Sequence, residues 1–292
     1  MPSDRTSQTI RRRRLAAELR RLREHAGLTG DEAAERLGWS GSKVSRIETH
    51  RIGVKPADLS KLLDLYEVDL SRREELTRFA LESSRAGALE SAVAGLPADY
   101  ADYLSAENEA YSIWNWDPVV VPGLLQTEAY ARAAIAGYQS MFRPSPGQAE
   151  RRIELRRLRQ QLLTRDPPVN LSVVIDESVL HRRFGPGAIM HEQMLHLAEL
   201  SELPTVQVRV LPLSNDHPVT TGAFSYMQFT QVHDVPLNDL VTVEHITASY
   251  YLEDEEETFR YRMAFERLTE DSLGPAESRD AILAAARETW AG

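Results

Sequence analysis

The sequence predicts a multidomain chain in which an all-α domain of five helices precedes a mixed α+β domain. Apolar residues recur at helical spacing as far as residue 84, and a stretch rich in Ala, Ser and Gly follows. Beyond it, β-like runs mix with helices without strict alternation, which is typical of α+β domains. We therefore predict domains over 1–84 and 101–292, joined by a connector over 85–100.

Two short helices joined by a glycine turn are the most informative part of the first domain. Thr29 and Glu32 form the T-x-x-E pattern of a capping box, which predicts a helix that begins near residue 30. Gly38 follows the last periodic residue of this helix, where a left-handed backbone is needed and glycine costs least. Ser40 is then placed to be the N-cap of the next helix.

The second of these helices presents small and basic side chains outward. Val44 and Ile47 are three residues apart and point inward. Outside or at the margin of this buried stripe lie Ser42, Lys43, Ser45 and Arg46. Such a helix fits the major groove of double-stranded DNA, with its first residues nearest the base edges and its first amides facing phosphate. We predict a DNA-binding helix-turn-helix; an ordinary helical hairpin is the alternative.

The charge of the chain is divided unevenly. The net charge is −10, but residues 1–56 carry 13 Lys/Arg against 7 Asp/Glu, whereas the remaining 236 residues carry 21 against 37. The first segment is thus +6 and the rest −16, which fits a basic region that touches phosphates. An arginine cluster at 11–14, continued by Arg20, Arg21 and Arg23, is expected to contact the DNA backbone; a solvated helix face is the alternative.

The remaining elements follow from periodicity and turn residues. Besides the central pair, the first domain is expected to contain helices over 11–26, 56–66 and 70–84. In the second domain we predict strands over 111–116, 169–175, 205–211, 223–229, 240–244 and 249–252. Its predicted helices span 127–136, 146–163, 187–201, 255–270 and 276–290.

The segment from about Arg11 to Val68 resembles the XRE/phage-repressor class of five-helix helix-turn-helix domains. The run RLGWSGSKVSRIE that ends at Glu48 is most similar to an actinobacterial branch of this class. The resemblance implies a structural ion pair between Arg23 and Glu48 that also faces phosphate. A glutamine that contacts phosphate is common in the class at the position of Gly30, so that contact would come from the backbone amide here. A glutamine that reads bases is common at the position of Gly41. Base reading would therefore shift to Ser40, Ser42, Lys43 and Ser45.

With the flanking arginines, the predicted DNA-binding residues are Arg13, Arg14, Arg23, Gly30, Ser40, Gly41, Ser42, Lys43, Ser45, Arg46 and Arg51.

The second domain carries a resemblance of its own. The run WDPVVVPGLLQTEAYAR at 116–132 resembles the signature of a large C-terminal domain found behind such DNA-binding units in actinobacteria, and 243–245 and 251–253 are similar to its later segments. Members of this group are described as antitoxin-like transcriptional regulators that often associate with a small separate partner protein. The resemblance supplies no catalytic residue.

No catalytic, cofactor or metal site is predicted. The chain lacks cysteine, which excludes disulfides, thiolate catalysis and cysteine-bound metals. His191 and His196 are five residues apart, so they diverge on a helix and do not share a metal easily. A G-x-S-x-G elbow is also absent from the sequence. The aromatic residues Trp114, Trp116, Tyr130 and Tyr138 are candidates for a ligand or partner pocket; packing within a core is the alternative.

The sequence thus predicts a cytoplasmic transcriptional regulator that is not an enzyme and that binds a roughly palindromic operator as a homodimer. Its second domain would mediate dimerisation and bind a small partner protein or a ligand. The alternative is an antitoxin-like interaction module that acts mainly through a small protein partner, with auxiliary DNA binding. We expect no association with membranes, because no apolar run approaches the roughly 20 residues that a membrane span needs.

Overall fold

The computed structural model describes residues 10–83, 98–142, 146–215, 217, 221–230, 238–245 and 248–290. The chain divides into two compact units. Helices α1–α5 and α7 belong to the first, and the second, over Ala110–Phe229 and Asn238–Gly292, contains a sheet and the remaining helices. An all-α helix-turn-helix region followed by a mixed α+β domain confirms the predicted fold class. Most of the predicted connector falls on residues 84–97, which lie outside the described residues.

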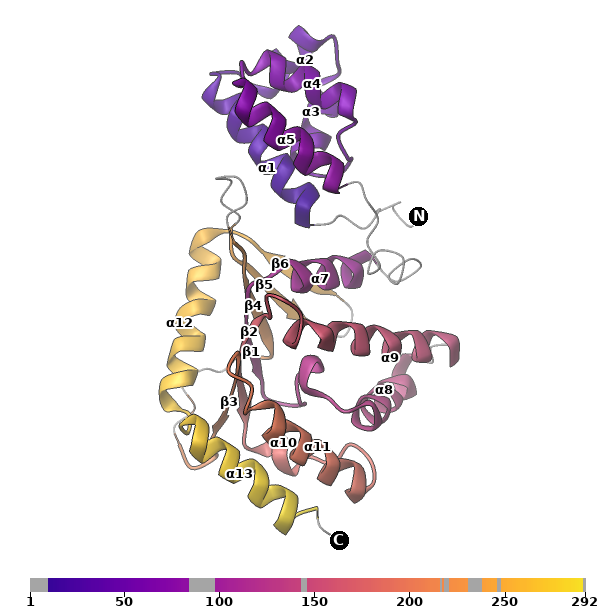
Figure 1. Ribbon diagram of the computed structural model, residues 1–292, viewed down its shortest axis with the longest axis vertical. Helices are drawn as coiled ribbons and strands as arrows, with labels where there is room; N and C mark the ends of the chain where they lie inside the picture. Colours follow the sequence, from indigo (N-terminus) through magenta and orange to yellow (C-terminus); the bar gives the residue numbers. More distant parts are fainter. Residues whose placement is uncertain are drawn as a thin grey trace. The chain divides into compact units, whose positions relative to one another are not determined.

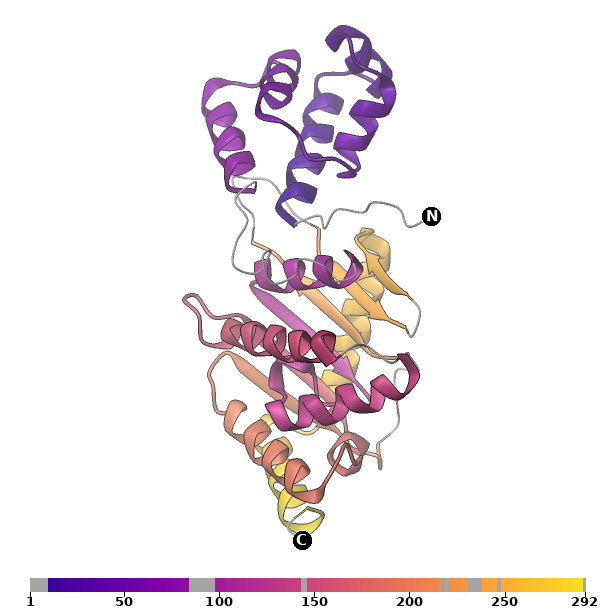
Figure 2. The same ribbon diagram turned by 90° about the vertical axis from the view of Figure 1, so that its right-hand side faces the viewer.

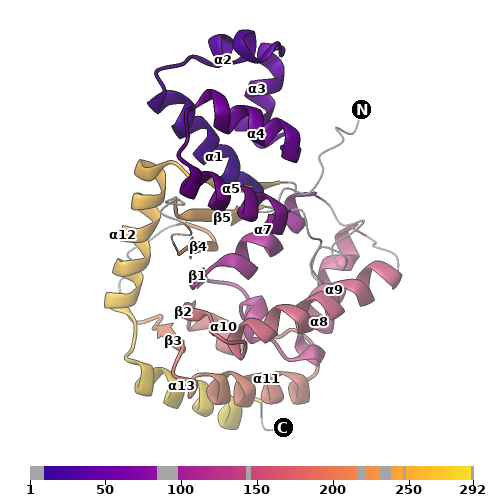
Figure 3. The ribbon, with the colours of Figure 1, turned by 45° about the horizontal axis from the view of Figure 1, so that its top comes forward.

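The helix-turn-helix domain is built from five helices around one core. They are α1 (Ile10–His25), α2 (Gly30–Leu37), α3 (Gly41–Glu48), α4 (Pro56–Leu65) and α5 (Leu70–Ser83). Side chains from all five meet in the core, among them the buried Leu19, Ala33, Ile47, Leu63 and Leu76. Because Ala33 and Ala34 on α2 are small and fully packed, α3 can cross α2 at close range (Figure 3).

A buried carboxylate joins α1 to α5. The Glu18 side chain is inaccessible to solvent and accepts hydrogen bonds from Arg21 (2.7 and 2.8 Å) and from Arg72 (2.9 Å). Burial alone would raise the pKa of Glu18, but the hydrogen bonds and charges of the two arginines outweigh it, and the pKa lies below its usual value. The ionised pair of Glu18 with Arg72 therefore helps to fix the angle between α1 and α5.

A helix not predicted from the sequence, α7 (Ala98–Glu109), precedes the second unit. The second unit is organised by a six-stranded sheet in the order β3-β2-β1-β4-β5-β6. The strands are β1 (Ser112–Asp117), β2 (Asn170–Asp176), β3 (Val206–Leu211), β4 (Phe224–Gln228), β5 (Leu240–Glu244) and β6 (Ser249–Leu252). Strands β1, β2 and β3 are parallel, whereas β1 and β4–β6 pair antiparallel.

Helices cover both faces of the sheet (Figures 1 and 2). One face carries α12 (Glu255–Asp271), whose Phe265 lies 5.2 Å from the ring of Trp114, while Tyr226 stacks on Trp114 at 5.0 Å. The opposite face carries α8 (Glu128–Phe142), α9 (Pro146–Gln160) and α11 (Gly187–Leu200). The remaining helical segments are η1 (Gly123–Leu125), η2 (Gln161–Leu163), α10 (Ser178–His181) and α13 (Pro275–Glu288).

The outer edge of β3 is closed by the turn between α12 and α13. The amide of Leu273 donates to the carbonyl of Val210 (2.9 Å), and the amide of Val210 donates to the hydroxyl of Ser278 (3.0 Å). The edge strand is thus bonded near its carboxyl end, which removes part of a site for pairing with another chain.

We expect Glu18→Gln to destabilise the helix-turn-helix domain by about 3 kcal/mol at pH 7, because it removes the charge of a fully buried carboxylate that pairs with Arg21 and with the largely buried Arg72. Since the pKa of Glu18 is lower in the folded state, this contribution is complete above the unfolded pKa and is lost as the pH falls through the folded one. Thermal unfolding followed by circular dichroism should show a Tm well below that of wild type at pH 7, and the difference in Tm should shrink near pH 3. Glu24→Gln, which affects an exposed pair with Arg20, is the control.

Candidate nucleic-acid interface

The turn between α2 and α3 has the geometry that its residues predict. The amide of Thr29 donates to the carboxylate of Glu32 (2.7 Å), and the amide of Glu32 donates to the Thr29 hydroxyl (3.2 Å), so both bonds of the capping box are present. Gly38 ends α2 with φ 65°, a left-handed conformation that favours glycine. Ser40 is the N-cap residue of α3, but its hydroxyl bonds to that of Ser42 (3.0 Å) instead of capping the helix.

One face of α3 is anchored in the core and the other is open to solvent. Val44 and Ile47 are buried, whereas Ser42, Ser45 and Arg46 are exposed. The Arg46 guanidinium turns back along the helix and donates to the carbonyl of Ser42 (3.2 Å), which places a positive charge beside the exposed hydroxyls. The exposed face therefore offers short hydroxyl side chains, which act as donors or acceptors, and one guanidinium.

Arg23 and Glu48, the residues that the resemblance implied would pair, join α1 to the end of α3. Two parallel hydrogen bonds link the guanidinium to the carboxylate, from Nε (2.7 Å) and from Nη2 (2.9 Å). The third nitrogen, Nη1, donates to the carbonyl of Leu28 (2.6 Å). Both side chains are about nine-tenths buried, so the guanidinium is committed to holding α3 in place.

Lys43 also has an intramolecular partner. Its ammonium lies 3.0 Å from the carboxylate of Asp58, in the first turn of α4, and 3.6 Å above the centre of the Trp39 ring. The side chains of Lys43 and Asp58 are 28% and 20% exposed, which leaves the pair shielded on most sides but reachable from solvent. The sequence identified Lys43 but gave no signal for Asp58, which lies fifteen positions further along.

A second carboxylate lies at the start of α3. A Cβ atom on Gly41 would fall 2.6 Å from Oδ1 of Asp31, so the glycine is what allows this carboxylate of α2 to approach. A glutamine at position 41, which is common in the class that the chain resembles, would require the Asp31 carboxylate to move. The two neighbours of α3 that sequence reasoning missed are therefore both acidic.

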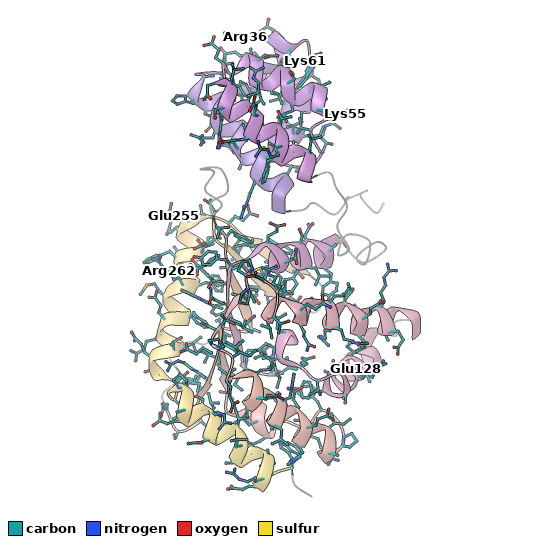
Figure 4. All side chains as sticks on the ribbon, viewed as in Figure 1. Arg36, Lys55, Lys61, Glu128, Glu255 and Arg262 are labelled. Carbon is teal, nitrogen blue, oxygen red and sulfur yellow. The ribbon has the colours of Figure 1, made fainter. Side chains whose placement is uncertain are left out.

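The other predicted DNA-binding residues are in varied environments. Gly30 is the first residue of α2, and Arg51 is exposed after α3. The side chain of Arg13 lies outside the described residues. Arg14 is 2% exposed and already engaged with other groups of the protein, so the structure does not present it to phosphate as we expected. Exposed basic side chains that the prediction omitted include Arg36, Lys55 and Lys61 (Figure 4).

The aromatic residues proposed to line a pocket in the second unit do not share one environment. Trp114 lies in the stack with Tyr226 and Phe265, and Trp116, on the same face of β1, donates from Nε1 to the carbonyl of Thr221 (3.3 Å). Tyr130 is fully buried and packs against Phe184, with ring centroids 5.4 Å apart. The side chain of Tyr138 lies outside the described residues.

The signature segment at 116–132 is held by buried amides. Gln193 on α11 is fully buried and bonds to two backbone groups of the segment, accepting from the amide of Thr127 (2.7 Å) and donating to the carbonyl of Leu125 (2.8 Å). Gln126 donates to the carbonyl of Val121 (2.6 Å). Each bond satisfies a backbone group in a loop that has no sheet partner, which explains why these residue types occur here.

At the carboxyl end of β1, Asp117 caps the same loop. Its carboxylate accepts from the amides of Val119 (3.2 Å) and Val120 (3.0 Å). Burial raises the pKa of Asp117 to about 6 in spite of these two bonds, and the charge of Glu244 adds to the increase. Within the described part of the chain, the side chains of His, Asp and Glu form no group of three that could hold a metal ion.

Comparison with known families identifies both units. Residues 14–76 match a family of helix-turn-helix domains, and this match supports a DNA-binding regulator. Residues 100–284 match the family described as a domain of unknown function (DUF5753), which covers more than half of the chain. The protein belongs to this family. No curated protein and no solved structure matches the chain. None of the helices in the described ranges is long and apolar enough to cross a bilayer.

We expect Arg23→Met to destabilise the helix-turn-helix domain by about 3–5 kcal/mol, because Glu48 would be left buried without its counter-ion. Hydrogen exchange of the α1 and α3 amides measures the loss directly. Arg20→Met is the matched control on the same helix, since its pair with Glu24 is exposed to solvent and contributes little to stability. Equal protection in the two variants would contradict a structural role for the pair.

Proposed function

We propose that this protein is a transcriptional regulator that inserts α3 into the major groove of its operator. The observation that carries the proposal is the exposed face of α3, which is rigidly attached to the core by Val44, Ile47 and the Arg23–Glu48 pair. A helix can report on base sequence only if its position relative to the rest of the domain is fixed, because base-edge hydrogen bonds tolerate little displacement.

The roles of the side chains follow from exposure and chemistry. Ser42 and Ser45 are small enough to approach base edges, and serine bonds to either donors or acceptors there. Arg46 has the donor geometry that guanine recognises. Arg51, Lys55 and the amide of Gly30 are suited to phosphates, which position a protein on DNA without reading sequence.

The double variant Ser45→Ala/Arg46→Ala should bind the operator at least about 30-fold more weakly, because it removes two base contacts that contribute about 1–3 kcal/mol each. The operator is the duplex that wild-type protein selects from a random pool, and binding is measured by fluorescence anisotropy at fixed salt. Arg287→Ala, which removes an exposed arginine of α13, is the control and should leave the affinity unchanged. Wild-type affinity in the double variant, with its fold intact, would refute the assignment of α3.

We further propose that the regulator acts as a homodimer, because one eight-residue helix reaches too few bases to select a site in a genome. The second unit, which makes up most of the chain, would supply the dimer contact and a binding surface for a small partner protein or a ligand. Exposed apolar side chains on α12, Phe259 and Met263, support an interaction role for this unit.

A dimer should bind two half-sites whose centres lie about 10–10.5 base pairs apart, or a multiple of that spacing, on one side of the duplex. Footprinting of the selected operator, combined with sedimentation of the free and bound full-length protein, tests this. A single half-site occupied by one chain would exclude the homodimer while leaving DNA binding intact.

Two parts of the proposal rest on the sequence and on its resemblance to antitoxin-like regulators of actinobacteria. The antitoxin-like assignment, in which a small partner protein carries the regulation and DNA binding is auxiliary, predicts that such a partner co-purifies with the chain and alters its operator affinity. We also propose a cytoplasmic regulator without catalytic activity, because a DNA-binding protein shares a compartment with its DNA and the sequence offers no coherent nucleophile or cofactor loop.

A further inference from the structure

Lys43 is the residue of α3 whose environment differs most from that of an ordinary DNA-contacting side chain. Long basic side chains on a recognition helix usually extend into solvent, where they meet any phosphate. The ammonium of Lys43 instead lies between the carboxylate of Asp58 (3.0 Å) and the ring of Trp39 (3.6 Å). Cation–π attraction and an ion pair act together on the same group.

We propose that Asp58 is a specificity-determining residue, which acts by restraining Lys43 in one position and withholding it from DNA phosphates. The inference rests on the proposed function, since it assumes that α3 meets DNA. While it is paired with Asp58, the ammonium cannot move toward a phosphate that lies elsewhere, so a contact at such a position requires the pair to be broken. The ammonium has three donors, so it can keep Asp58 and still donate to a base acceptor that reaches its fixed position.

The position of Asp58 suits this role. It lies in the first turn of α4, which begins at Pro56, so its charge is stabilised by the amides at the start of that helix. Its side chain is only 20% exposed, which weakens the screening of the pair by salt. The carboxylate is therefore a persistent competitor to phosphate rather than a transient surface contact.

The consequence is an asymmetry between specific and non-specific DNA. Non-specific binding consists almost wholly of phosphate contacts that release counterions, and each one contributes about 0.9 to the slope of log K against log salt concentration. A restrained Lys43 contributes little to that slope. Replacement of Asp58 by Asn frees the ammonium while preserving the size of the side chain, so non-specific binding gains a contact that operator binding does not need.

The test compares full-length wild type with Asp58→Asn on two probes: a mixed-sequence duplex of about 30 base pairs, and the duplex that wild type selects from a random pool. We expect Asp58→Asn to bind the mixed duplex about fivefold more tightly, with a salt slope steeper by about 0.9, and to gain less on the selected duplex. The ratio of the two affinities therefore falls.

Two further variants separate restraint of Lys43 from simple removal of a negative charge. Asp31→Asn removes another carboxylate near the start of α3 and should leave the salt slope unchanged. In a Lys43→Met background, Asp58→Asn should no longer steepen the slope. If it steepens the slope equally there, or if the slope of Asp58→Asn equals that of wild type, the inference is overturned. Absence of DNA binding by wild type would instead refute the proposed function.

Discussion

The attachment of α3 to the rest of its domain is the constraint on which the proposed DNA recognition depends. Two apolar side chains of an eight-residue helix cannot alone fix both its position and its rotation. The bidentate pair of Arg23 with Glu48 adds a directional restraint at the far end of the helix, and the bond from Arg23 to the carbonyl of Leu28 ties the same guanidinium to the end of α1. Planar pairing resists rotation as well as separation, which an apolar contact does not.

The features that could be predicted from the sequence are those set by neighbouring residues. The capping box of Thr29 and Glu32 and the left-handed Gly38 involve residues within one turn of each other, and both are present. The contacts of Lys43 with Asp58 and of Gly41 with Asp31 join residues fifteen and ten positions apart on different helices. Their pairing depends on how the helices pack, which no local pattern encodes. Arg14 is a further example. Its place in a run of arginines predicts an exposed side chain, yet the side chain is buried.

In the second unit, the mixture of strands and helices could be predicted but the strand order could not. Strand β1 pairs with β2, more than fifty residues later, and with β4, more than a hundred residues later. Alternation of apolar residues identifies each strand without identifying its neighbours.

The structure also changes the interpretation of the signature segment at 116–132. Gln126, within the segment, and Gln193, on α11, hold backbone groups of this buried loop, which gives both side chains a structural role.

The acidic neighbours of α3 bear on how a protein with a net charge of −10 selects DNA. Most of the affinity of DNA-binding proteins comes from phosphate neutralisation, which is the same for every sequence. Under the proposed role of Asp58, a domain that holds Lys43 against this carboxylate gives up part of that affinity. Under the proposed function, the remaining binding depends more on the hydroxyls of Ser42 and Ser45 and on Arg46, which we propose to contact bases. Discrimination is the difference between the binding free energies for operator and for non-specific DNA. Weaker non-specific binding therefore increases discrimination as effectively as stronger operator binding does.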